Sequence, residues 1–166
     1  IRWAWQPVID GNIISRRPLE AWMSGKFNRV PILTGSATNE GAYYVPQKPD
    51  KPEDFTNFFR SLLPHLTKDE VAELEKLYPD PSTNPDSPHV DTRGFPGIGS
   101  QYRRLETAYG HYAYTCPVRQ TVIWATSHDA PQPAYLYHWA LNKTALFGAN
   151  HGDQMRYQTF NREVRE

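Results

Sequence analysis

Two short Gly-rich segments of this sequence contain the residue types of a hydrolytic acid–base pair. Residues 35–41 (Gly-Ser-Ala-Thr-Asn-Glu-Gly) include Glu40, and residues 148–153 (Gly-Ala-Asn-His-Gly-Asp) include His151. A carboxylate bonded to an imidazole fixes its tautomer and stabilises the imidazolium that forms during proton transfer. Taken alone, each residue is more commonly a polar loop side chain, so the pair depends on the elements that position it.

Both segments follow stretches that are typical of buried strands. The run 30–34 is short, apolar and bounded by Pro and Gly, and the run 134–139 is a second strand candidate. In open α/β sheets, ligands bind beyond the carboxyl ends of the strands. If the two strands are parallel, Glu40 and His151 lie at the same edge of the sheet.

Between the two strands, the spacing of apolar residues predicts helices that are long enough to act as crossovers. The order strand, helices, strand favours an α/β fold with a parallel sheet. A capping box opens at Thr67, and the Pro-rich stretch 79–99 is expected to be a loop. Helices are expected at 18–23, 55–63, 67–77, 100–112, from 117 to the turn at 129 and within 151–160, with a further short strand at 5–9.

The predicted sheet is too small to be a complete core. Parallel strands need both faces covered, and this chain offers two or three of them. We therefore expect most of the sheet to lie outside the segment, with residues 1–166 forming part of a single domain. The start at Ile1, followed closely by two tryptophans, is typical of the middle of a larger protein or of a processed start.

Composition and motifs exclude several classes of function. The formal net charge is zero, so no basic excess indicates nucleic-acid binding. No apolar stretch approaches the roughly 18 residues of a membrane span, and no signal peptide is visible in residues 1–25. No phosphate loop and no H-E-x-x-H zinc motif occurs, and the remaining histidines are scattered. We therefore expect no metal and no organic cofactor.

Three further features concern burial and modification. Tyr102, Tyr109 and Tyr112 share one face of the helix predicted at 100–112 and are interpreted as core. Cys116 is the single cysteine, interpreted as a small buried residue or, alternatively, as the partner of a cysteine outside this chain. Asn142 begins the one N-x-[ST] sequon, a possible glycosylation site that slightly favours secretion.

Several segments, in register, resemble the type-B carboxylesterase and lipase family, the cholinesterase-like branch of the α/β-hydrolases. The resemblance covers nearly the whole chain. The matching segments are Trp5–Gly11 (family pattern F-x-P-V-x-D-G), Ser24–Gly35 (S-G-x-x-x-x-V-P leading into the acid strand), Thr38–Gly41 (x-x-E-G), 101–119 ending in C-P-x-R, and Gly148–Asp153 (G-x-x-H-(G/A)-x-(D/E)). The resemblance implies an α/β-hydrolase fold in which Glu40 is the triad acid and His151 the triad base.

The resemblance also has departures. Family members often have Asp where this chain has His111, and an acidic residue where it has Gln154. More important, the G-x-S-x-G nucleophile elbow and the H-G-G-G-type oxyanion segment are absent from the sequence. In this family both belong N-terminal to the acid, so we expect them upstream of Ile1.

The sequence therefore predicts the C-terminal part of a serine carboxylesterase or lipase that acts on a small-molecule carboxylic ester or a lipid. The upstream half of the same fold would be required for activity, and the isolated chain would be inactive. Secretion is the expected localisation. The alternatives are a non-catalytic cholinesterase-like adhesion or binding protein and an inactive truncated fragment.

Overall fold

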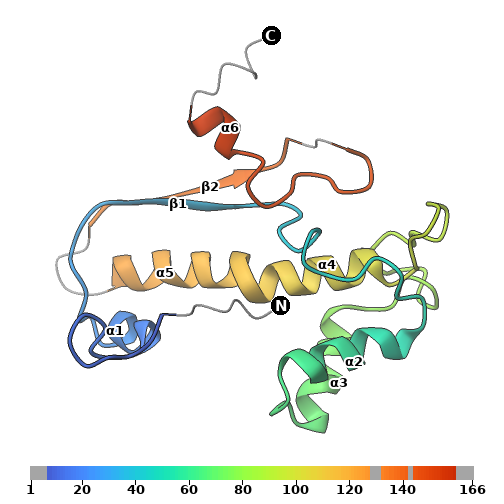
Figure 1. The fold of residues 1–166 in the computed structure, drawn as a ribbon, viewed down its shortest axis with the longest axis horizontal. Coiled ribbons are helices and arrows are strands. Elements are labelled where there is room, and N and C mark those ends of the chain that lie inside the picture. Colours follow the sequence, from blue (N-terminus) through green and yellow to red (C-terminus); the bar gives the residue numbers. More distant parts are fainter. Residues whose placement is uncertain (1–6, 128–131, 142–143, 160–166) are drawn as a thin grey trace.

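The computed structural model describes residues 7–127, 132–141 and 144–159. In these residues, two parallel strands form one sheet, β1 (Ile32–Ala37) and β2 (Ala134–Trp139) (Figure 1). The register pairs Ile32 with Ala134 and Ala37 with Trp139. The loops that contain Glu40 and His151 therefore leave the sheet at the same edge, as predicted.

A long, nearly continuous helix runs along one face of this sheet (Figure 1). It consists of α4 (Tyr102–Gly110), a π-helical turn η1 (His111–Thr115) and α5 (Cys116–Ser127). Both strands contact α5, β1 also contacts η1, and the short helix α1 (Pro18–Met23) packs against α5. This long helix therefore lies beneath the strand ends.

The apolar core lies between the helices rather than under the strands. Helices α2 (Pro52–Leu62) and α3 (Lys68–Leu77) pack against each other at the far end of α4. Helix α2 contributes Phe55 and Phe59, which are buried against one another with ring centroids 5.1 Å apart. The buried cluster comprises Ala42, Val45, Phe55, Phe59, Tyr102, Leu105 and Ala108.

Local signals fix the ends of these helices. The predicted capping box is confirmed: Thr67 Oγ1 accepts from the Glu70 backbone N–H at 3.2 Å, and Glu70 Oε2 accepts from the Thr67 N–H at 2.8 Å. At the start of α2, the Asp54 carboxylate accepts the Lys51 N–H at 3.0 Å. Both contacts satisfy donors that a helix start otherwise leaves unpaired.

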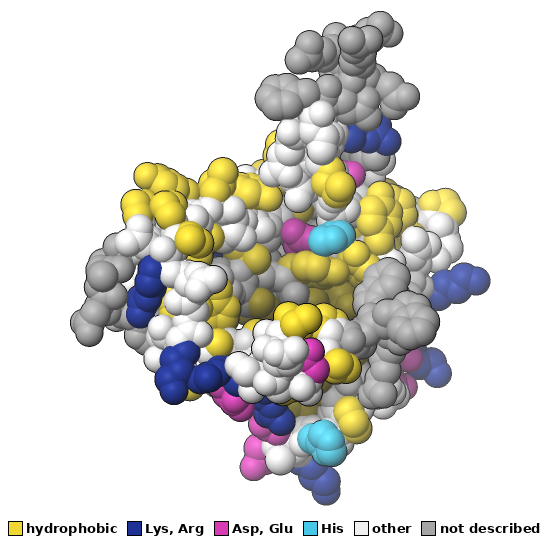
Figure 2. Space-filling view, turned by 60° about the vertical axis from the view of Figure 1, so that its left-hand side comes forward, with side chains coloured by type: hydrophobic (Ala, Val, Ile, Leu, Met, Phe, Trp, Pro, Cys, Tyr) yellow, Lys and Arg dark blue, Asp and Glu magenta, His cyan; other side chains and the backbone are white. Residues whose placement is uncertain are grey.

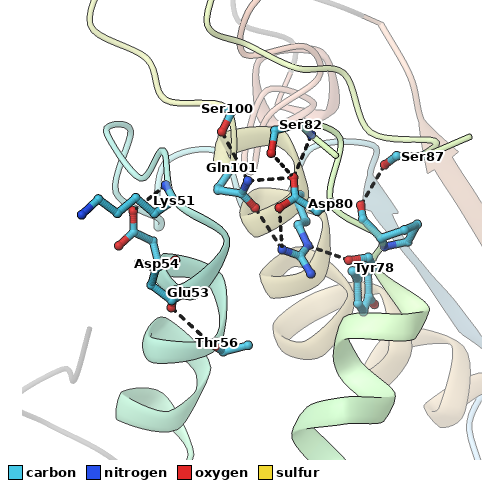
Figure 3. A network of polar contacts seen from close by, with 12 residues as sticks. Lys51, Glu53, Asp54, Thr56, Tyr78, Asp80, Ser82, Ser87, Ser100 and Gln101 are labelled. Carbon is cyan, nitrogen blue, oxygen red and sulfur yellow. Dashed lines mark hydrogen bonds and ion pairs between the residues drawn. The ribbon is translucent and has the colours of Figure 1, made fainter. Parts of the chain in front are cut away.

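The Pro-rich stretch 79–99 forms turns without a regular element, as predicted, and buried polar groups hold it in place (Figure 3). Arg104 donates to the Tyr78 carbonyl at 2.6 Å and to Gln101 Oε1 at 2.9 Å. Asp80 accepts from Gln101 Nε2 at 2.9 Å and lies 4.0 Å from Arg104. Polar bonds replace the regular hydrogen bonds that this segment lacks.

The two-stranded sheet is incomplete, as predicted. Leu33 is 74% exposed and Tyr135 is 63% exposed, although a parallel strand in a finished α/β sheet is covered on both faces. Beyond β2, the chain passes through the loop with His151 into the short helix α6 (Met155–Gln158).

Three interpretations need correction. Residues 7–9 form no strand, and residues 1–6, the rest of the proposed strand 5–9, lie outside the described residues. Cys116 is exposed at the first residue of α5. Tyr112 is 47% exposed, since η1 turns it away from the face that buries Tyr102. The sequon residue Asn142 also lies outside the described residues.

Candidate active site

Glu40 and His151 meet at the strand ends. Glu40 Oε2 lies 2.6 Å from His151 Nδ1, although the two residues are 111 positions apart in the sequence. The Glu40 side chain is 5% exposed, whereas the His151 side chain is 41% exposed. One partner is therefore fixed inside the fold while the other reaches solvent. On the face shown in Figure 2, a histidine and an acidic side chain lie together beside a hollow lined by hydrophobic side chains.

Glu40 is held from both sides of its carboxylate. Its second oxygen, Oε1, accepts the backbone N–H of Ala37 at 2.6 Å. Ala37 is the last residue of β1, so the strand itself orients the carboxylate. With Oε1 bonded to the backbone, Oε2 is directed toward the imidazole.

The two loops remain paired beyond the ends of the strands. The Asn39 N–H donates to the Ala149 carbonyl at 2.9 Å, and Asn39 forms an isolated parallel bridge with Asn150. These residues immediately precede Glu40 and His151. The backbone pairing therefore sets the separation of the two functional side chains.

The Asn39 side chain connects both loops to the long helix. Its Oδ1 accepts the Ala149 N–H at 3.1 Å, and its Nδ2 donates to Glu106 Oε1 at 2.7 Å. Glu106 is 1% exposed and pairs with Arg103 at 3.0 Å. Burial raises the pKa of the Glu106 carboxyl, and the bonds from Asn39 and Arg103 act in the opposite direction. We call Asn39, Arg103 and Glu106 the polar clamp.

Two glycines make this close packing possible. Gly148 has φ +62°, and a Cβ at this position would lie 2.0 Å from Asn39 Oδ1. A Cβ on Gly41, next to Glu40, would lie 2.0 Å from the Glu106 carbonyl oxygen. At both positions only glycine lets the backbone approach so closely.

Two tyrosines contact the imidazole. The Tyr114 ring centroid lies 4.5 Å from that of His151 at an interplanar angle of 39°. The Tyr44 ring meets the imidazole edge-on at 5.6 Å. Burial, and then the hydrogen bond with Tyr44, raises the pKa of the Tyr114 hydroxyl, which therefore stays neutral throughout the physiological range.

The two departures from the family pattern lie at the margin of this site. His111 Nδ1 is 2.9 Å from the Tyr78 hydroxyl, so the imidazole makes a hydrogen bond with the residue that ends α3. Burial lowers the pKa of His111. Gln154 Oε1 is buried and has no hydrogen-bond partner among the described residues, whereas Asp153 Oδ2 accepts the Asn150 N–H at 2.8 Å.

No set of three or more His, Cys, Asp or Glu side chains in the described ranges is arranged to hold a metal ion. Nor does any helix in that part of the chain have the length and apolar character to cross a membrane.

The structure brings Glu40 and His151 together, and it adds residues that sequence reasoning missed. The polar clamp and the tyrosines at positions 44 and 114 were not predicted. Only Asn39 carried a usable signal, because it directly precedes the candidate acid. Arg103, Glu106 and Tyr114 lie on the long helix, and nothing in the sequence distinguishes these three positions from their neighbours.

With this geometry described, the comparison with known proteins defines the class. A model of the carboxylesterase family matches residues 1–165, and the chain belongs to that family. Its structure resembles the crystal structure of Aspergillus niger EstA with a TM-score of 0.73 at 23% identity, over 93% of this chain and 28% of that chain. The predicted α/β-hydrolase fold with an incomplete sheet is thereby confirmed.

Curated relatives include lipases. The chain is 30% identical over 131 residues to Secreted lipase 4 of Gibberella zeae. The aligned region covers 79% of this chain and 23% of that protein. It is 24% identical over 163 residues to Lipase 4 of Diutina rugosa, covering 96% of this chain and 29% of the lipase. The chain therefore spans about a quarter of the length of the relatives it matches.

Proposed function

We propose that this chain supplies the acid and the base of a serine-dependent carboxylic ester hydrolase. The observation that carries the proposal is the 2.6 Å contact between Glu40 Oε2 and His151 Nδ1 at the carboxyl ends of two parallel strands. Membership of the carboxylesterase family supports it. Because Glu40 occupies Nδ1, the other ring nitrogen, Nε2, is the atom that exchanges protons with substrate.

The proposed reaction has two stages. His151 first removes the proton of a serine hydroxyl, which attacks the ester carbonyl, and then gives that proton to the leaving alcohol. A water molecule next attacks the acyl-serine, again with His151 as the base, and releases the carboxylic acid. Glu40 keeps the imidazole in one tautomer and stabilises the imidazolium.

The serine and the oxyanion hole belong, in this proposal, to a segment N-terminal to Ile1 within the same α/β-hydrolase domain. The exposed faces of β1 and β2 support this, because the strands of a finished parallel sheet are covered on both faces. Loss of a nucleophile costs on the order of 10⁶ in kcat in a serine hydrolase. The 166-residue chain alone is therefore expected to be essentially inactive.

The substrate is proposed to be a carboxylic ester or lipid, and the protein to be secreted. Two relatives are named as lipases, and one of these is named as secreted.

The direct test is ester hydrolysis by the longest natural form of the protein, with and without His151→Ala. We expect the substitution to lower kcat by about 10⁴-fold or more. His138→Ala is the matched control: His138 is an exposed histidine on β2, bonded to Thr38 Oγ1 at 2.9 Å. Activity that survives His151→Ala unreduced would overturn the proposal.

The intact mass of the protein from its natural source separates the alternatives. A mass well above 19.1 kDa, together with ester hydrolysis, supports the proposal. The same large mass without hydrolysis of any ester would instead indicate a binding or adhesion protein. A mass of 19.1 kDa would indicate an inactive fragment.

A further inference from the structure

The aromatic contact with His151 arises from an irregular turn of the long helix. The helix changes from α to π over His111–Thr115 and returns to α at Cys116. π turns occur mostly as single bulges inside α-helices and are frequently found at functional sites. The π turn η1 contacts β1, and the C-terminal end of β1 leads to Glu40.

The π turn separates two side chains that an α-helix would place on one face. Residues three positions apart are neighbours on the surface of an α-helix. His111 and Tyr114 have this spacing, yet His111 bonds to Tyr78 at the end of α3 while Tyr114 packs against His151. The wider turn thus lets one short segment contact two different parts of the fold.

The Tyr114 ring is close enough to stabilise a charge on the imidazole. Aromatic rings attract a cation that lies within about 6 Å of the ring centroid, and the two centroids here are 4.5 Å apart. During the proposed reaction, the imidazole becomes a cation when it takes the proton from serine. The contact therefore strengthens at the stage at which catalysis needs it.

We propose that Tyr114 is a positioning residue that holds the His151 ring in place and stabilises its protonated form through the face of its own ring. The catalytic part of this inference rests on the proposed function, whereas the contact with the protonated imidazole does not. Tyr114 itself touches neither the substrate nor the reacting oxygen.

The aromatic face, rather than the hydroxyl, is expected to act. The described titratable groups recorded in contact with the imidazole are Glu40, Tyr44 and Tyr114. Glu40 supplies the negative charge in the plane of the imidazole ring. The hydroxyl of Tyr114 stays neutral because burial raises its pKa, so it adds no charge of its own.

The variants Tyr114→Leu and Tyr114→Phe separate the ring from the hydroxyl. Tyr112→Leu is the matched control, because Tyr112 belongs to the same π turn but is 47% exposed and its recorded ring contact is with Tyr109. The first readout is the pH midpoint of the His151 ring signals in NMR spectra of the longest natural form. The second is the separate measurement of kcat and KM for the longest natural form.

Tyr114→Leu should lower the His151 midpoint by about half a pH unit to one unit. It should also lower kcat by roughly threefold to tenfold with KM unchanged. Tyr114→Phe should restore both values, and Tyr112→Leu should change neither.

The inference would be overturned if the His151 midpoint of Tyr114→Leu equalled that of wild type. It would also be overturned if Tyr114→Phe lowered the midpoint as far as Tyr114→Leu does. If Tyr114→Leu does not fold, Tyr114→Trp decides, since Trp binds cations best among the aromatic residues; its midpoint should equal or exceed that of wild type, and a lower one contradicts the inference. A lowered midpoint in a protein that hydrolyses no ester would uphold the contact and reject the proposed function.

Discussion

The strand ends and the helical end of this molecule are held together in different ways. At the strand ends, polar side chains that are far apart in sequence contact one another, as in the Glu40–His151 and Asn39–Glu106 bonds. At the helical end, apolar rings such as Phe55 and Phe59 pack within a single helix and against its neighbours. The strand ends set the geometry of the acid–base pair, and the helical end supplies buried apolar area.

This difference separates chemistry from stability. Removal of buried apolar surface lowers the free energy of unfolding. A polar contact that orients a proton carrier affects the reaction far more than the fold. Substitutions at the strand ends should therefore lower turnover, and substitutions at the helical end should lower stability.

The largest expected effect is that of Glu40→Gln on turnover. The amide keeps the shape of the side chain but cannot hold the imidazole in the tautomer that accepts a proton at Nε2. Loss of the acid in a serine triad costs about 10⁴-fold in kcat. Assays of the longest natural form, with thermal unfolding as the folding control, measure this; equal losses of activity and of folded protein would contradict it.

Phe59→Ala should lower the stability of the protein and leave its turnover almost unchanged. Phe59 is 1% exposed in the buried cluster, and replacing a buried Phe with Ala costs about 3–5 kcal/mol of unfolding free energy. Denaturant unfolding measures the loss, and kcat per folded molecule should stay near the wild-type value. A large fall in kcat at full folding would remove the distinction between the two regions.

Gly148→Ala is an intermediate case at the strand ends. The added Cβ would lie 2.0 Å from Asn39 Oδ1, so the polar clamp must shift. Because a displacement of about 1 Å can cost about 100-fold in rate, we expect a tenfold to 100-fold fall in kcat. Gly11→Ala is the control, since Gly11 also has a positive φ, +77°, but has open space around it. Equal effects of the two substitutions would show that backbone strain, rather than the clamp, is responsible.

The smallest effect concerns pH. Burial raises the pKa of Glu106 above its ordinary value of 4.5, so the folded state holds this proton more tightly than the unfolded chain does. The associated stability is complete below the ordinary value and is lost as pH rises through the raised one. The midpoint temperature of thermal unfolding should therefore fall more steeply for wild type than for Glu106→Gln as the pH rises from 4.5 to 8. Parallel curves would contradict this.

Local elements could be predicted from sequence because their signals are local. The helix 18–23 and the strand 134–139 have the predicted bounds, and Thr67 caps α3 as expected. The π turn at 111–115 could not be predicted, since it depends on contacts of His111 and Tyr114 with distant residues. Strand β1 continues to Ala37, beyond the predicted end at Thr34, because β2 pairs with it through Gly35 and Ser36.

The candidate site could be predicted only in outline. Glu40 and His151 stand out because each lies in a Gly-rich loop after a strand. The polar clamp joins Asn39 to Arg103 and Glu106, and nothing in a single sequence relates position 39 to these two helix positions. Their meeting follows from the three-dimensional path of the long helix beneath both loops.

The measurement that tests the central claim most directly is labelling of the longest natural form by a fluorophosphonate, which reacts with an activated serine. Intact mass and peptide mapping locate the label in wild type and in His151→Ala. We predict one labelled serine N-terminal to this chain in wild type, and labelling lost in the variant. Equal labelling of both proteins, or none in wild type, would contradict the assignment of Glu40 and His151 as the acid and base of a serine hydrolase.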